Sequence, residues 1–92
     1  RQNQPDKSAA RAQTKLSYKQ TYLLEKLPGQ IAALQDNIKA ADLRLTDMTF
    51  YAEDPGAYQK LAEQTKQDKE ELARMEDDWL TLELLRGELS SG

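Results

Sequence analysis

Basic and aromatic side chains alternate near the start of this 92-residue chain. Lys15, Lys19 and Lys26 are four and seven positions apart, a spacing that places side chains on one face of an α-helix. Tyr18 and Tyr22 stand among these lysines and are also four positions apart. Lysine ammonium groups contact phosphates and aromatic rings stack on bases, so the pattern is typical of a nucleic-acid-binding surface. The ordinary surface of an amphipathic helix explains the pattern about as well, and both interpretations stay open.

The net charge changes sign along the chain. Residues 1–30 contain six Lys or Arg and two Asp or Glu, a net charge of +4. Residues 31–92 contain seven Lys or Arg and fourteen Asp or Glu, a net charge of -7. A polyanion is therefore expected to contact the N-terminal third of the chain and to be repelled by much of the rest. The candidate nucleic-acid-binding residues are Lys7, Arg11, Lys15, Lys19 and Lys26.

Residue types that support catalysis are missing or scattered. The chain has no His and no Cys, and its four glycines are too far apart to form a loop that cradles phosphate. Its many carboxylates fit solvated helix faces better than a catalytic pocket. We therefore expect a non-catalytic chain without a metal or a cofactor.

Composition divides the chain into three parts. Residues 1–14 contain no large apolar side chain, and we expect them to form a flexible basic linker. Residues 15–89 carry the apolar positions and are the predicted folded domain. Residues 90–92, Ser-Ser-Gly, are expected to be a disordered tail.

Local signals predict where the helices begin and end. Ser17 and Gln20 have the spacing of a capping box, which predicts a helix start at Tyr18. Pro28 lacks an amide hydrogen and Gly29 adds backbone freedom, so a break or kink is expected there. Asp54 followed by proline predicts the start of a second long helix. The expected helices span about residues 17–27, 29–48 and 55–88.

Apolar residues recur three and four positions apart in both arms, which predicts two packed helical seams. The connection over residues 49–53 is too short for parallel helices. The predicted fold is all-α: an antiparallel two-helix coiled-coil hairpin with the first arm broken or kinked at Pro28-Gly29. The first seam contains Leu24, Leu27, Ile31, Leu34, Ile38, Ala41, Leu45 and Met48. The second contains Tyr58, Leu61, Thr65, Asp68, Leu72, Met75, Trp79, Leu82, Arg86 and Leu89.

The seams also predict which residues face each other. With a turn near Tyr51, the numbers of facing residues sum to about 103. The predicted pairs are Leu45 with Tyr58, Ile38 with Thr65, Ile31 with Leu72 and Leu24 with Trp79. Core packing of Trp79 is therefore favoured over a role as an exposed stacking platform. Thr65 and Asp68 interrupt the second seam, and we expect them to reach water at its edge.

Three ordered segments carry a resemblance to a known family. They are residues 15–19 (Lys-Leu-Ser-Tyr-Lys) followed by Leu27-Pro28, the tip at Asp47 and residues 50–55 (Phe-Tyr-Ala-Glu-Asp-Pro), and residues 79–83 (Trp-Leu-Thr-Leu-Glu). Together they resemble the C-terminal coiled-coil domain of Uup-type ABC-F ATPases. The resemblance covers about residues 15–86. It implies a bacterial cytoplasmic ATPase with two nucleotide-binding domains, linked to ribosome function and transposon excision, whose C-terminal domain binds DNA.

Two positions depart from the family pattern. Met48 follows Asp47 where the family usually has Asp-Pro, so the first helix is expected to run further. Asp78 replaces a residue that is often basic, which weakens DNA contact by the second helix and favours the N-terminal arm.

Two functional hypotheses follow. The first is a non-catalytic accessory domain that binds DNA or RNA weakly and without sequence preference. The second is a spacer arm that contacts protein or the ribosome and does not touch nucleic acid, which the acidic balance of residues 31–92 favours. The expected partners are nucleic acid, the ATPase domains of the parent chain and the ribosome. A cytoplasmic monomer is expected, and no apolar run approaches the roughly 20 residues of a membrane span.

Overall fold

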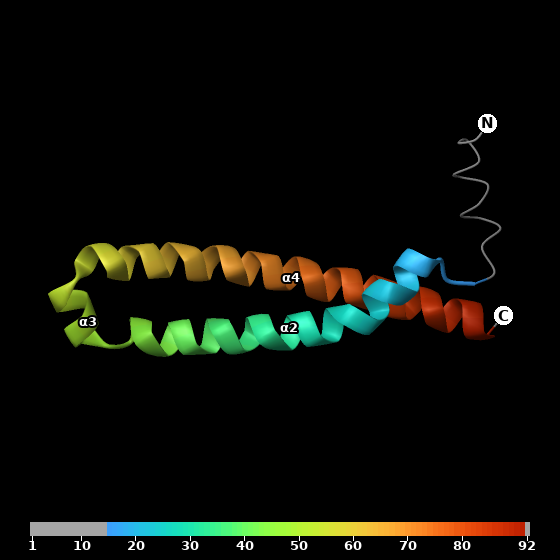
Figure 1. Cartoon of the computed structure of the whole chain (residues 1–92), viewed down its shortest axis with the longest axis horizontal. Coiled ribbons are helices and arrows are strands. Elements are labelled where there is room, and N and C mark those ends of the chain that lie inside the picture. Colours follow the sequence, from blue (N-terminus) through green and yellow to red (C-terminus); the bar gives the residue numbers. More distant parts are fainter. Residues whose placement is uncertain (1–14, 92) are drawn as a thin grey trace, which may run out of the picture.

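The computed structural model describes residues 15–91, which form three helices and no strand. They are α2 (Tyr18–Leu45), α3 (Met48–Glu53) and α4 (Pro55–Ser91). The predicted all-α class is confirmed. Figure 1 shows α2 and α4 side by side along most of their length, with the short α3 joining them at one end of a molecule 59 Å long.

The predicted start of the first helix is confirmed. Ser17 is the N-cap of α2, and its hydroxyl oxygen accepts a hydrogen bond from the Gln20 amide at 3.1 Å. The Gln20 side-chain oxygen accepts one from the Ser17 amide at 2.9 Å, which completes the capping box. Two amides without helical partners are thus satisfied where α2 begins. The predicted linker, residues 1–14, lies outside the described residues.

The expected break of the first helix at Pro28 does not occur, because α2 continues through it as one helix of 28 residues. Pro28 cannot donate to the Leu24 carbonyl, so one helical hydrogen bond is lost. Packing on both sides of the proline offsets that loss. Leu27, only 5% exposed, shares a hollow with Leu82 of α4, and Ile31 shares another with Trp79.

Replacing Pro28 with alanine is expected to stabilise the protein. Proline in a helix interior costs about 3 kcal/mol of stability relative to alanine. The unfolded chain is more flexible with alanine, which offsets up to about 1 kcal/mol of the gain from the substitution. The free energy of unfolding of Pro28→Ala, measured by urea denaturation, should therefore rise by about 2 kcal/mol. Gly29→Ala is the matched control, since an added Cβ there meets nothing within 4 Å and should contribute only about 0.5–1 kcal/mol. A Pro28→Ala midpoint at or below that of the parent would contradict this account.

The tip of the molecule differs from the prediction. The first helix ends at Leu45 rather than near residue 48, because Asp47 caps a separate helix by accepting from the Thr49 amide at 2.9 Å. Residues 49–53, expected to form a plain connection, therefore belong to α3. Met48 is 67% exposed and lies outside the seam where it was expected. The predicted start of the second long helix is confirmed: α4 begins at Pro55, and Asp54 accepts from the Ala57 amide at 3.0 Å.

The core is a thin strip between α2 and α4. Leu27, Ile38 and Leu82 are its buried apolar residues, and the other seam residues of α2 up to Leu45 are half-buried. Arg86 is exposed, contrary to its predicted seam position, and Leu85 takes the half-buried place instead. At its end, α4 continues through Ser91, into the segment expected to be a tail.

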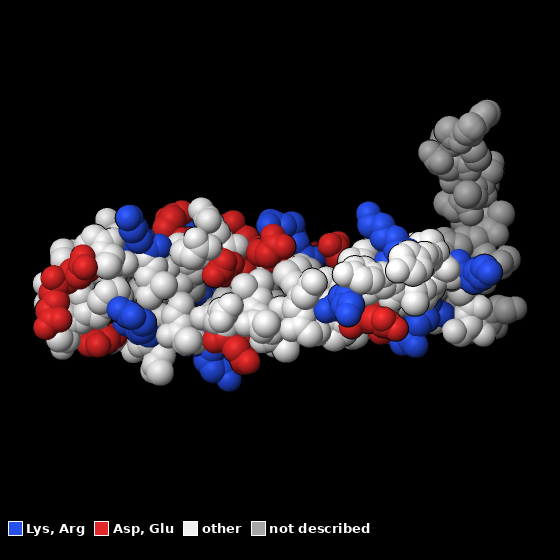
Figure 2. Space-filling model, viewed as in Figure 1, with Lys and Arg blue, Asp and Glu red and all other residues white. Residues whose placement is uncertain are grey.

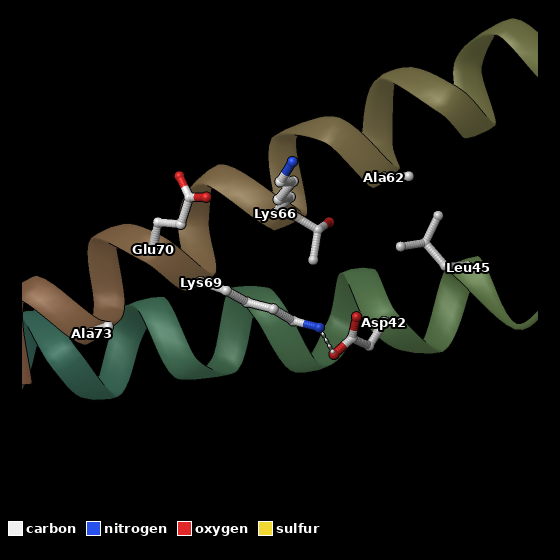
Figure 3. Close-up of a pocket in the computed structure, with 8 residues that line it drawn as sticks. Asp42, Leu45, Ala62, Lys66, Lys69, Glu70 and Ala73 are labelled. Atoms are coloured by element: carbon white, nitrogen blue, oxygen red, sulfur yellow. Dashed lines mark ion pairs between the residues drawn. The ribbon is translucent and has the colours of Figure 1, made fainter.

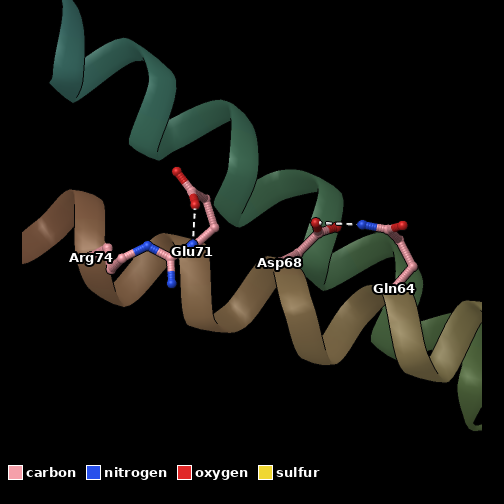
Figure 4. Close-up of polar contacts among 4 residues, drawn as sticks. All are labelled: Gln64, Asp68, Glu71 and Arg74. Atoms are coloured by element: carbon pink, nitrogen blue, oxygen red, sulfur yellow. Dashed lines mark hydrogen bonds and ion pairs between the residues drawn. The ribbon is translucent and has the colours of Figure 1, made fainter.

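Thr65 is buried, and the expectation that it reaches water is wrong. Its hydroxyl donates to the Leu61 carbonyl at 2.7 Å, so the buried hydroxyl is satisfied within its own helix. Asp68 does reach the edge, where its carboxylate accepts from the Gln64 amide nitrogen at 2.9 Å. Figure 4 shows this pair and the Glu71–Arg74 ion pair along one side of α4.

The predicted register of the two long helices is met near the tip, where the Tyr58 hydroxyl donates to the Leu45 carbonyl at 2.7 Å, a predicted pair whose numbers sum to 103. Two polar contacts further along the helices have a larger sum. Gln35 donates to Glu76 at 3.3 Å and Lys69 pairs with Asp42 at 3.2 Å, so both pairs sum to 111. Trp79 consequently shares a hollow with Pro28 and Ile31, and Ile31 does not face Leu72 as predicted. Residues 49–53 belong to the helix α3 and are not the plain connection on which the predicted sum of 103 depended.

Candidate nucleic-acid interface

The three described candidate lysines lie at the beginning of α2 and are exposed. Lys19 is in the first turn, and Lys26 lies seven positions later on the same side of the helix. Lys15 precedes the N-cap Ser17, so it flanks the helix and does not extend the helical row. Lys7 and Arg11 lie outside the described residues.

Two tyrosines complete this surface. Tyr18 is 86% exposed and Tyr22 is 48% exposed, on the side of α2 away from Leu27. The Lys26 ammonium nitrogen lies 5.8 Å from the centroid of the Tyr22 ring, within the range of a cation–π contact. The structure therefore brings a cation and an accessible aromatic face together. We call Lys15, Tyr18, Lys19, Tyr22 and Lys26 the Tyr-Lys surface.

The charge around this surface is mixed. On the face in Figure 2, Lys and Arg side chains gather near the end where α2 begins and α4 finishes, and acidic side chains gather at the opposite end over α3. α4 contributes acidic residues to the basic end as well, including Asp78, Glu83 and Glu88. Arg86 forms an ion pair with Glu83 on the same helix. At this end of the molecule, the lysines at the start of α2 are therefore the basic groups that a polyanion is expected to meet.

The opposite end carries an aromatic cluster. The Tyr58 ring lies 5.0 Å from the Tyr51 ring in a T-shaped pair and 5.6 Å from the Phe50 ring. The Tyr58 hydroxyl donates to the Leu45 carbonyl at 2.7 Å, and the Arg44 guanidinium stacks 4.3 Å from the Phe50 centroid. The Arg44–Phe50 contact crosses the turn between α2 and α3, so helical spacing does not predict it. The carboxylates of Asp47, Glu53 and Asp54 make this end acidic, so it is expected to repel a polyanion.

A groove between the long helices contains the mixed charges drawn in Figure 3. It has a volume of about 460 Å³ and is lined by small and apolar residues such as Leu45, Ala62 and Ala73. The Lys69 ammonium pairs with the Asp42 carboxylate at 3.2 Å, and both side chains are about half exposed. An ion pair so open to water adds little stability. Within residues 15–91, no group of His, Cys, Asp or Glu is arranged to hold a metal ion.

Trp79 is half-buried beside Pro28 and Ile31, and its indole nitrogen is inaccessible to solvent. That nitrogen has no hydrogen-bond partner within the described part of the chain. The ring is therefore packed between the helices, as the favoured prediction held.

Comparisons with known proteins give one result that bears on this surface. A family model described as ABC transporter C-terminal domain matches residues 15–84, which include the whole Tyr-Lys surface. Searches of curated proteins and of solved structures found no match. Within the described residues, no helix is both long and apolar enough to cross a membrane.

Proposed function

Since the chain belongs to the ABC transporter C-terminal domain family, we propose that it is a non-catalytic accessory domain that binds DNA or RNA through the Tyr-Lys surface. The observation that carries the proposal is the meeting of three exposed lysines with two exposed tyrosines at the start of α2. Lys7 and Arg11 are proposed to add phosphate contacts. The segments at residues 15–19, 50–55 and 79–83 support assignment of the parent protein to the Uup-type ABC-F ATPases of the bacterial cytoplasm.

The proposed binding is weak and independent of sequence. Lysine interacts with phosphate as a point charge, and such contacts carry no information about the bases. Non-specific binding of this kind has a Kd of about 10⁻⁴ to 10⁻⁶ M at physiological salt. The acidic side chains of α4 near the same end repel a polyanion and lower the affinity further.

The two long helices are proposed to act as an antiparallel coiled-coil arm with a kink at Pro28-Gly29. Apolar contacts of Leu27 with Leu82 on one side of the proline, and of Ile31 with Trp79 on the other, support a rigid arm. In the full ATPase, such an arm would hold the Tyr-Lys surface in a fixed position relative to the nucleotide-binding domains. We propose that the chain by itself is a monomer.

A second function is favoured by the other end of the molecule. The acidic tip, with its aromatic cluster and the exposed side chains of Met48 and Tyr51, is then the contact for a protein of the ribosome or for the ATPase domains. In that case the chain is a spacer or interaction arm and does not bind nucleic acid directly.

A charge-neutralised variant distinguishes the two functions. Changing Lys15, Lys19 and Lys26 together to Gln should weaken binding to a labelled DNA duplex at least tenfold in fluorescence anisotropy at low salt, because about three released counterions are lost. The matched control changes Lys39, Lys60 and Lys66 to Gln, three exposed lysines away from the start of α2. It should bind like the parent. Equal affinity of the two variants, with circular dichroism unchanged, would favour the interaction arm.

A further inference from the structure

Tyr18 lies almost fully in solvent, although α2 has a seam of residues packed against α4. At 86% exposure it contributes little to the core, whereas Leu23 and Leu27 on the same helix line a hollow against α4. Tyr22, one turn later, is 48% exposed. The two rings therefore form a pair of aromatic faces on the outside of α2, beside Lys19 and Lys26.

We propose that the Tyr-Lys surface selects single-stranded nucleic acid, whose bases stack on Tyr18 and Tyr22 while the lysines hold its phosphates. This inference rests on the proposed nucleic-acid binding and adds the class of nucleic acid that is bound. Stacking of a base on an aromatic side chain contributes to single-strand binding without regard to sequence, because every base has a π-face.

The spacing of the rings favours a single strand over a duplex. Positions four apart on an α-helix are separated by about 6 Å along its axis. Neighbouring bases in a duplex strand are about 3.4 Å apart and cover each other's faces. Two bases that each lie on one of these rings must be unstacked from each other, which a single strand allows at small cost and a duplex does not.

The contact between Lys26 and Tyr22 places a phosphate-binding group next to a base-stacking ring. With the ammonium nitrogen 5.8 Å from the ring centroid, a phosphate bound by Lys26 lies close to a base on Tyr22. Tyr22 is 48% exposed, so part of its side chain stays accessible to a base beside the Lys26 ammonium. A duplex can still use Lys15, Lys19 and Lys26, so the lysines serve both kinds of nucleic acid and the tyrosines serve the single strand.

The test compares the two contributions on one set of ligands. The full chain is titrated by anisotropy with a labelled DNA single strand, an RNA of the same sequence and the DNA duplex, at one low salt concentration. The parent should bind a single strand more tightly than the duplex. Tyr18→Ala with Tyr22→Ala should weaken single-strand binding about tenfold or more and change duplex binding less than twofold.

Two control variants separate stacking from other effects. Tyr18→Phe with Tyr22→Phe keeps both rings and should bind like the parent. Leu80→Ala with Leu84→Ala removes two exposed apolar side chains of α4 and should also leave binding unchanged. Because all four residues are exposed, each variant should keep the parent's circular dichroism.

The outcomes are distinct. Loss of DNA or RNA single-strand binding in the alanine variant supports stacking, and the ligand that is more affected identifies the preferred strand. If the parent binds duplex and single strand equally and the alanine variant binds like the parent, the stacking proposal is wrong while the nucleic-acid function stands. If the parent binds none of the three ligands, the proposed function itself fails.

Discussion

Raising the salt concentration from about 50 to about 200 mM is expected to weaken the binding of duplex DNA about 40-fold. Each phosphate that a lysine neutralises releases counterions, and the logarithm of the affinity falls with the logarithm of the salt concentration by about 0.9 per contact. Contacts from Lys15, Lys19 and Lys26 give a slope of about -2.7. Anisotropy titrations of the parent at four or five salt concentrations measure this slope.

The slope also reports whether residues before Lys15 take part. If Lys7 and Arg11 each neutralise a phosphate as well, five contacts give a slope of about -4.5 and a loss of about 500-fold over the same range. The variant Lys7→Gln with Arg11→Gln should then return the slope to about -2.7. A slope near zero for the parent would show that lysine–phosphate contacts are not the basis of binding.

The salt measurement bears on the acidic residues of α4 too. Asp78, Glu83 and Glu88 stand near the end of the molecule that carries the Tyr-Lys surface, and Glu83 already holds Arg86. Their repulsion of a polyanion is screened as salt rises, with a Debye length of about 10 Å at 0.1 M. Asp78→Asn should therefore strengthen duplex binding more at 50 mM than at 200 mM.

How far the sequence predicts the fold depends on whether the signal is local. The capping box at Ser17 and the Asp54-Pro55 start of α4 are local hydrogen-bond patterns, and both are confirmed. The break at Pro28 is also a local signal, yet it is overruled by packing of Leu27 and Ile31 against α4, which lies some fifty residues further along the chain. The register is also non-local, because it depends on how the chain turns at the tip: Tyr58 meets Leu45 as predicted, whereas Gln35 with Glu76 and Asp42 with Lys69 sum to 111.

The positions of the candidate site residues on α2 are predicted in part. The spacing of Lys19 and Lys26 correctly indicates one side of a helix, whereas Lys15 falls outside it because the cap at Ser17 fixes where the helix begins. The Lys26–Tyr22 contact follows from residues four apart on that helix. By contrast, the Arg44–Phe50 stack depends on the direction in which the chain leaves α2. Side-chain exposure, which makes Tyr18 informative, is known only from the packed structure.

The leucines at the end of α4 provide the sharpest test of the packing. Leu82 is 9% exposed in the hollow with Leu23 and Leu27, and Leu84, two positions later, is 62% exposed. Replacing a buried leucine with alanine costs about 2–5 kcal/mol, from lost apolar transfer and from the cavity that remains. Since domains have total stabilities of about 5–15 kcal/mol, Leu82→Ala should unfold at a much lower urea concentration than the parent.

Leu84→Ala is the matched control, with the same side chain removed from the same helix. Its free energy of unfolding should stay within about 0.5 kcal/mol of the parent, because the site is exposed and alanine is the better helix former. Leu72→Ala, at a half-buried seam position, should fall between the two. This order follows from burial alone and is independent of ligand binding. Equal destabilisation by Leu82→Ala and Leu84→Ala would mean that α4 packs a different face against α2. The exposure of the residues in the Tyr-Lys surface would then differ from that described above.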